Sequence, residues 1–105
     1  MWSRAALLIV GLLCGCSAQS SRPNFREDIE PLLMSACIRC HDENHIQLNL
    51  YDHPRRTLID KGLISPGDPE MSPFFLRVRD GHPERTPLPE QQVVLIKHWI
   101  ASGAP

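Results

Sequence analysis

Aromatic residues are scarce in this sequence, and prolines are frequent. Phenylalanine, tryptophan and tyrosine make up 6% of the 105 residues, whereas 10 residues are proline. A chain of this length forms one small domain, whose core is marginal without a disulfide, a metal or a cofactor. Because aromatic packing supplies little here, we expect one of these groups to complete the core.

Neither sign of charge is in excess. The 11 Lys and Arg residues nearly balance the 12 Asp and Glu residues, which leaves a net charge of −1. Nucleic-acid-binding domains carry a basic excess, so this class of function is not expected. The sequence also shows no nucleophile with its base, no paired-carboxylate site and no phosphate-binding loop, so we do not expect an enzyme.

The N-terminal apolar run is too short to cross a membrane. It extends from Ala5 to Leu13 and follows Arg4, and it has about half the length of a spanning helix. A charged start, a short apolar stretch and small residues after it are typical of a secretory signal. The sequence therefore predicts export.

The Leu-Cys-Gly-Cys sequence that ends at Cys16 resembles a bacterial lipobox, in which the final Cys becomes the lipidated first residue. We expect lipidation of Cys16, and a simple signal cut at Gly15 or after Ala18 is the alternative. Several acyl chains together give stable anchoring, whereas one chain is marginal. In the lipoproteins that it resembles, a residue other than Asp at the position of Ser17 goes with the outer membrane.

These features divide the chain into three parts. Residues 1–16 are the expected lipoprotein signal, residues 17–24 a short polar tether and residues 25–105 the folded domain. We expect the domain in the periplasm, tethered to a membrane, with the outer membrane favoured.

Helical periodicity is clear at both ends of the domain. Phe25, Ile29, Leu32 and Leu33 recur at three- and four-residue spacing, behind Asn24 as a helix cap with Glu27 completing a capping box. Pro31 lies inside this pattern and should kink or divide the helix. At the other end, Pro89 and Glu90 open a helix that Gly103 terminates.

The middle of the domain reads mostly as loop. Ser72 and Pro73 look like the N-cap and first residue of a short helix over residues 74–78, stopped at Gly81. Another short helix from Pro54 to Gly62 is possible. No strand pattern appears, and the sequence predicts an all-α domain with long loops.

The sequence Cys37-Ile38-Arg39-Cys40-His41 is the Cys-x-x-Cys-His pattern of haem c attachment. Two thiols about one helical turn apart can reach the two vinyl groups on one edge of a porphyrin. The adjacent His41 then lies under the ring as the proximal iron ligand. We therefore predict one covalently bound haem c.

Three other interpretations of this pattern stay open. A thioredoxin-like redox pair requires alternating strands and helices, which the sequence does not show. Half of a zinc site is possible, with His41 and His45 as further ligands. A plain disulfide is also possible, since export permits one.

Further motifs resemble the planctomycete-type cytochrome c domain, a class I-like family, over about residues 25–105. They are Ile29-Glu30-Pro31-Leu32-Leu33, Pro66-Gly67-Asp68-Pro69-Glu70-Met71-Ser72, Pro87-Leu88-Pro89-Glu90-Gln91-Gln92 and Trp99-Ile100-Ala101-Ser102-Gly103-Ala104-Pro105. The resemblance implies a small cytochrome c fold, with three to four helices and long loops around one haem. It also implies electron transfer.

The resemblance implies the second iron ligand as well. In that family a Met-Pro-Pro sequence shortly before the last helix supplies it, and His82-Pro83-Glu84 stands at that place here. We therefore predict His82 as the distal ligand, and so a bis-histidine haem of low potential. Met71 is the competing candidate and is otherwise expected in the core. Another histidine or an open site is a further possibility.

The remaining candidates have weaker claims on the haem. His45 is expected on the proximal side, and His53 and His98 are expected to be exposed. Trp99 should anchor the last helix against Phe25 and Ile29. Two sets of residues could also contact the haem: Phe74, Phe75 and Leu76 at its edge, and the basic residues Arg55, Arg56 and Lys61 at its propionates, although a solvated face is the simpler reading for the basic residues.

Three functions are consistent with these features. The first is a monomeric electron-transfer protein that exchanges electrons with redox proteins. The second is a haem-based gas or redox sensor, in which a small ligand displaces the distal residue. The third is an interaction domain held together by zinc or a disulfide.

Overall fold

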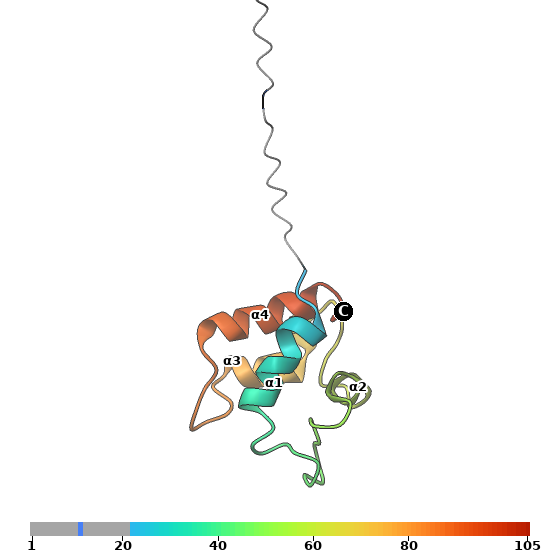
Figure 1. The fold of residues 1–105 in the computed structure, drawn as a ribbon, viewed down its shortest axis with the longest axis vertical. Coiled ribbons are helices and arrows are strands. Elements are labelled where there is room, and N and C mark those ends of the chain that lie inside the picture. Colours follow the sequence, from blue (N-terminus) through green and yellow to red (C-terminus); the bar gives the residue numbers. More distant parts are fainter. Residues whose placement is uncertain (1–10, 12–21) are drawn as a thin grey trace, which may run out of the picture.

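The computed structural model describes residues 22–105 together with Gly11 (Figure 1). Apart from Gly11, the predicted signal segment and the lipidation residue Cys16 lie outside the described residues. Among the residues that the structure describes, no helix has the length and apolar character needed to cross a membrane.

The described part of the chain is helical and contains no strand, which confirms the predicted all-α class. The elements in chain order are a π-helix η1 (Phe25–Ile29), α1 (Glu30–Ala36), α2 (Pro54–Asp60), a 3-10 helix η2 (Pro69–Met71), α3 (Pro73–Arg79) and α4 (Glu90–Ala101). Long loops join α1 to α2 and α3 to α4.

The first helix is divided near Pro31, as predicted. The π-helix ends at Ile29 and α1 begins at Glu30, so the proline lies at the change from one type of helix to the other. Asn24 caps the π-helix, and its Oδ1 accepts the N–H of Glu27 at 2.8 Å.

The capping box closes on a different carboxylate from the one predicted. The N–H of Asn24 donates to Asp28 Oδ2 at 2.9 Å, and Glu27 does not take this role. A π-helical turn contains about one residue more than an α-helical turn, because its hydrogen bonds run five residues back. The side chain that reaches back to the cap is therefore four residues on instead of three.

Trp99 joins the two ends of the domain. Its side chain is 0% exposed, and its ring lies 5.7 Å from that of Phe25, between centroids. Trp99 Nε1 donates to the carbonyl of Pro105 at 3.0 Å, and the same carbonyl accepts the N–H of Phe25 at 2.8 Å. The predicted anchoring of the last helix against Phe25 is confirmed.

The two middle helices form where the sequence predicts them, with small differences at their ends. α2 ends at Asp60, before Gly62, and α3 is one residue longer at each end than the predicted 74–78 helix. Ser72 precedes α3, but its side chain does not cap the helix.

The Ser72 side chain forms hydrogen bonds elsewhere, so the prediction that it caps α3 is wrong. Its hydroxyl is 0% exposed and accepts the N–H of Ser65 at 2.9 Å, while it lies 2.8 Å from the carbonyl of Asp68. The turn before η2 therefore holds this hydroxyl away from the start of α3.

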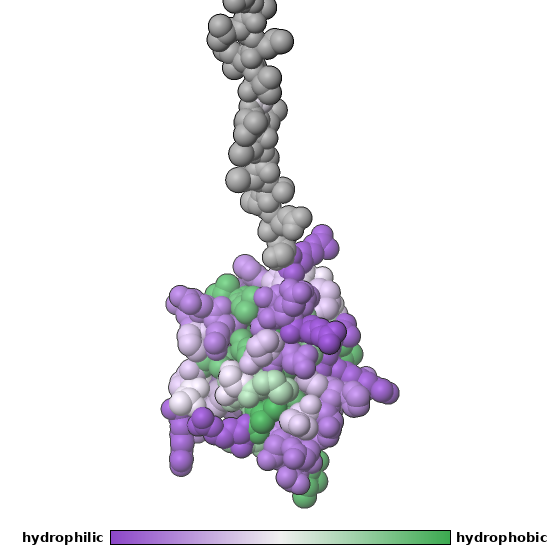
Figure 2. All heavy atoms as spheres, viewed as in Figure 1, coloured by the Kyte–Doolittle hydropathy of each residue, from purple (hydrophilic) through white to green (hydrophobic). Residues whose placement is uncertain are grey.

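The core is mainly aliphatic and draws on every α-helix. Its fully buried large side chains are Ile29, Leu33, Leu50, Leu58, Ile96, Trp99 and Ile100. Outside this core, the face in view in Figure 2 is largely hydrophilic with small hydrophobic patches. In Figure 1, the N-terminal end of the described segment and the C-terminus lie at one end of the domain, and the loops after α1 and α3 lie at the opposite end.

Candidate haem site

A cavity of about 400 Å³ lies among the loop after α1, the helix α3 and the loop after α3. This volume falls within the range of small-molecule and cofactor sites, about 300–1,000 Å³. Six of its lining residues carry a thiol, imidazole, amide or guanidinium group: Cys37, His41, His45, Gln47, Arg77 and His82. The others are apolar: Leu48, Leu50, Leu63, Pro73, Phe74, Val78 and Pro83.

The Cys-x-x-Cys-His segment continues from the end of α1 as a turn. The N–H of Cys37 donates to Leu33 O at 2.9 Å, and the N–H groups of Cys40 and His41 both donate to Cys37 O, at 3.1 and 2.8 Å. This turn places Cys37 and His41 in the wall of the cavity. Cys40 is exposed and is not part of that wall.

Burial determines the chemistry of the Cys37 thiol. Desolvation, with a smaller contribution from Cys40, raises the pKa of Cys37 to about 11. The thiol is therefore protonated at neutral pH, whereas a thioredoxin-like redox pair requires a lowered thiol pKa. Both thiols are free in the structure, so neither the redox-pair nor the disulfide interpretation gains support.

His41 is oriented by the backbone of its own loop. Its Nδ1 lies 3.3 Å from the carbonyl oxygen of Leu48, which can only accept, so Nδ1 carries the proton and Nε2 keeps a free lone pair. Burial lowers the pKa of His41, and the neighbouring His45 lowers it further, against the opposing effect of the Leu48 bond. The neutral imidazole that a metal requires is therefore favoured.

His82 faces His41 across the cavity. It follows α3, where its N–H donates to Arg77 O at 3.0 Å. The two ring centroids are 6.3 Å apart, with an interplanar angle of 45°. A metal–imidazole bond of roughly 2.0–2.1 Å puts each ring centre about 3 Å from the metal, so one ion between two imidazoles needs about this separation.

The competing ligand Met71 lies elsewhere. It ends η2, it is 68% exposed, and it does not line the cavity. The expectation that it packs in the core is wrong, because the 3-10 turn directs residues 70 and 71 outward while Ser72 takes the buried position.

The other histidines divide as the sequence suggests. His45 lies on the same loop as His41, with ring centroids 4.7 Å apart, and also lines the cavity. His53 precedes α2 and His98 lies on α4, and both are exposed outside the cavity wall.

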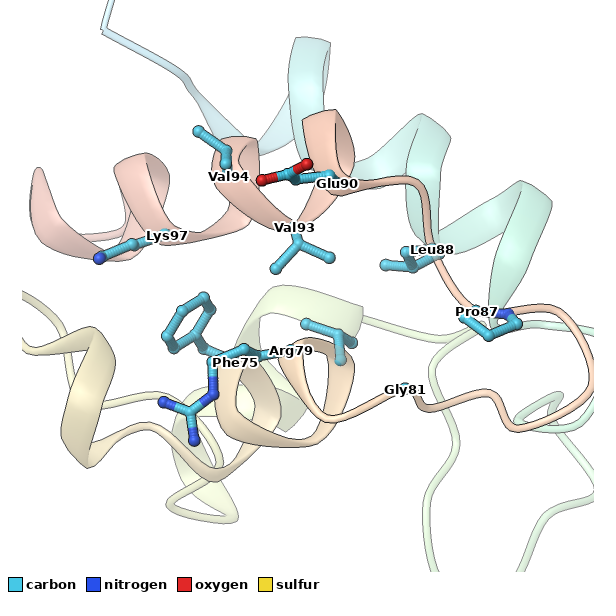
Figure 3. Close-up of a pocket in the computed structure, with 10 residues that line it drawn as sticks. Phe75, Arg79, Gly81, Pro87, Leu88, Glu90, Val93, Val94 and Lys97 are labelled. Carbon is cyan, nitrogen blue, oxygen red and sulfur yellow. The ribbon is translucent and has the colours of Figure 1, made fainter.

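Of the three predicted contacts from residues 74–76, only Phe74 lines the cavity. Phe75 is 3% exposed and lies between α3 and α4, at the groove drawn in Figure 3. That groove contains no His or Cys side chain. Leu76 lines neither hollow.

The predicted basic cluster is also away from the cavity. Arg55 Nε donates to the carbonyl of Ala104 at 2.9 Å, and Arg56 pairs with Asp60 on the surface of α2. Lys61 does not line the cavity either.

Sequence reasoning missed Arg77, which carries the charged group nearest to this site. Phe74, Arg77 and Val78 have the spacing i, i+3 and i+4, and all three line the cavity. The same periodicity, applied to α3 with Phe74 as its first inward residue, could have identified Arg77.

The described residues contain no group of three or more His, Cys, Asp or Glu side chains that could hold a metal ion. A structural zinc site needs four such ligands, so the zinc interpretation has no support in this part of the chain. A haem needs only two axial ligands from the protein, because its porphyrin supplies four nitrogens. Comparisons with models of protein families, with curated proteins and with solved structures find no match.

Proposed function

We propose that the protein is an electron carrier with one c-type haem, bound through Cys37 and Cys40 and ligated by His41 and His82. The observation that carries this proposal is the placement of two facing imidazoles, 6.3 Å apart, in a cavity whose wall includes the Cys-x-x-Cys-His turn. The bound haem would supply a one-electron Fe(III)/Fe(II) couple.

The chemistry of the cavity wall suits a porphyrin. Leucine, proline, phenylalanine and valine side chains cover most of it, and an apolar wall excludes water from a bound cofactor. Arg77 supplies a positive charge that can pair with a haem propionate.

The axial pair favours a low reduction potential. A second histidine in place of methionine stabilises ferric iron relative to ferrous iron. The bond between His41 Nδ1 and the Leu48 carbonyl adds to this effect, because a hydrogen-bonded ring N–H makes the imidazole a stronger donor.

Six-coordinate iron leaves no position for a substrate, which favours electron transfer over gas sensing. The protein then serves to set the potential and to hold the haem at a suitable distance from its redox partners.

The arrangement of the domain suits a lipid tether at Cys16. The N-terminal end of the described segment lies opposite the loops that follow α1 and α3 (Figure 1). An anchored chain would therefore keep the haem site on the side away from the tether, facing periplasmic partners. The tether raises the local concentration of membrane-bound donors and acceptors.

The protein purified from a host with cytochrome c maturation machinery tests this proposal. We expect haem that survives acid–acetone extraction, and a ferrous spectrum that carbon monoxide leaves unchanged. Extractable or absent haem would contradict the proposal. Rapid carbon monoxide binding would instead favour the gas-sensor alternative.

A further inference from the structure

We infer that His45 is a positioning residue, which holds the Leu48 peptide in place so that its carbonyl orients the proximal ligand His41. This inference rests on the proposed haem function and assigns a role to a histidine that does not itself bind iron.

The segment from His41 to Leu50 is a closed loop. The N–H of Leu50 donates to the carbonyl of His41 at 2.9 Å, which joins the two ends of the loop. Leu50 is 2% exposed and so fixes this junction to the core. Compact loops of this kind are packed by their own side chains.

Two hydrogen bonds inside this loop meet at Leu48. Its N–H donates to Nδ1 of His45 at 2.9 Å, and its carbonyl accepts from Nδ1 of His41 at 3.3 Å. Leu48 is thus held from both sides by histidine rings whose centroids lie 4.7 Å apart.

The two hydrogen bonds give the histidines different roles: His45 fixes the Leu48 peptide, and that peptide orients His41. The N–H of Leu48 has His45 as its partner, so loss of that imidazole frees the backbone that presents the Leu48 carbonyl. The carbonyl keeps the proton on Nδ1 of His41, which leaves the lone pair of this cavity-lining imidazole on Nε2. Such partners of a ligand histidine fix its ring orientation and raise its basicity.

His45→Leu removes the acceptor, whereas His45→Asn keeps one, because an Asn side chain can accept from a backbone N–H three residues on. His98→Leu, on the exposed face of α4, is the matched control. The wild type and the three variants are prepared in full length with haem attached. Two quantities are measured: hydrogen exchange at the Leu48 amide and the midpoint potential of the haem.

In His45→Leu we expect Leu48 amide exchange to rise about tenfold, the equivalent of one hydrogen bond. The midpoint potential should become more positive, since a less firmly held His41 donates less to ferric iron. His45→Asn should restore both quantities toward the wild-type values, and His98→Leu should change neither.

A haem-loaded His45→Leu protein with unchanged exchange and unchanged potential would overturn the inference. If that variant does not fold, amide hydrogen exchange in the wild-type protein tests the inference instead. The Leu48 amide should then exchange more slowly than the Gln47 amide. Equal rates would overturn the inference. Absence of haem from the wild type would instead overturn the proposed function, so the two failures are distinguishable.

Discussion

The imidazole rings of His41 and His82 face each other with their centroids 6.3 Å apart. His41 belongs to the loop after α1, whereas His82 belongs to the loop after α3. This separation matches the space that one metal ion coordinated by two imidazoles occupies. By contrast, His41 and His45, at 4.7 Å, are too close to hold an ion between them in this way.

Replacement of His82 by methionine should raise the reduction potential. A thioether in place of an imidazole stabilises ferric iron less, and we expect a rise of roughly 0.1–0.3 V within the ~0.8 V range of axial tuning. A redox titration of the purified variant measures it. His98→Met, at an exposed position on α4, is the control and should leave the potential where it is. Equal potentials in His82→Met and wild type would show that His82 is not the ligand.

Replacement of Arg77 by leucine should lower the potential. The guanidinium lies in the cavity wall, where its positive charge disfavours the ferric state. Because Arg77 is exposed, solvent screens this effect, and we expect a decrease of roughly 10–40 mV. Arg79→Leu on the same helix is the control, since Arg79 pairs with Glu70 and Asp80 instead. A decrease of the same size in both variants would argue against a specific role for Arg77.

Alkaline pH should destabilise the haem-free chain through Cys37. Burial raises the pKa of this thiol from 9.0 to about 11, so above pH 9 the unfolded chain loses the proton that the folded chain retains. The free energy of unfolding should therefore fall between pH 9 and about 11, by up to about 3 kcal/mol. Denaturant titrations followed by circular dichroism measure this decrease. Cys37→Ala should abolish this decrease, and Cys40→Ala should retain most of it. If the free energy of unfolding of Cys37→Ala falls with pH as steeply as that of the wild type, Cys37 is not its source.

Removal of the Ser72 hydroxyl should weaken the fold more than removal of an exposed one. Ser72→Ala leaves the N–H of Ser65 without its partner inside the domain, at a cost of about 1–3 kcal/mol. The matched variant Ser35→Ala removes a hydroxyl from an exposed residue of α1 and should cost less. Urea unfolding of the two variants compares them, and equal losses would contradict the role given to Ser72.

Much of the fold could be predicted, because the helix signals are local. Periodicity locates the helices, and the residues that begin them, such as Asn24 and Pro73, act within one turn. The errors arise where the backbone departs from a regular α-helix. The π-helical first turn moves the capping partner to Asp28, and the turn before η2 draws the Ser72 hydroxyl inward.

The candidate site likewise contains some features that local sequence patterns predict and others that depend on how the chain folds. The Cys-x-x-Cys-His turn is a local pattern, whereas the prediction of His82 depends on the place of His82-Pro83-Glu84 shortly before the last helix. The roles of Leu48 and His45 could not be predicted, because they depend on the loop folding back so that Leu50 bonds to His41. No spacing rule specifies such a backbone contact.

The most direct test of a haem held between His41 and His82 is the low-temperature electron paramagnetic resonance spectrum of the oxidised, matured protein. We expect a six-coordinate, low-spin ferric signal in the wild type and its conversion to a high-spin signal in His82→Ala. A high-spin signal in the wild type, or a low-spin signal that His82→Ala leaves unchanged, would contradict it.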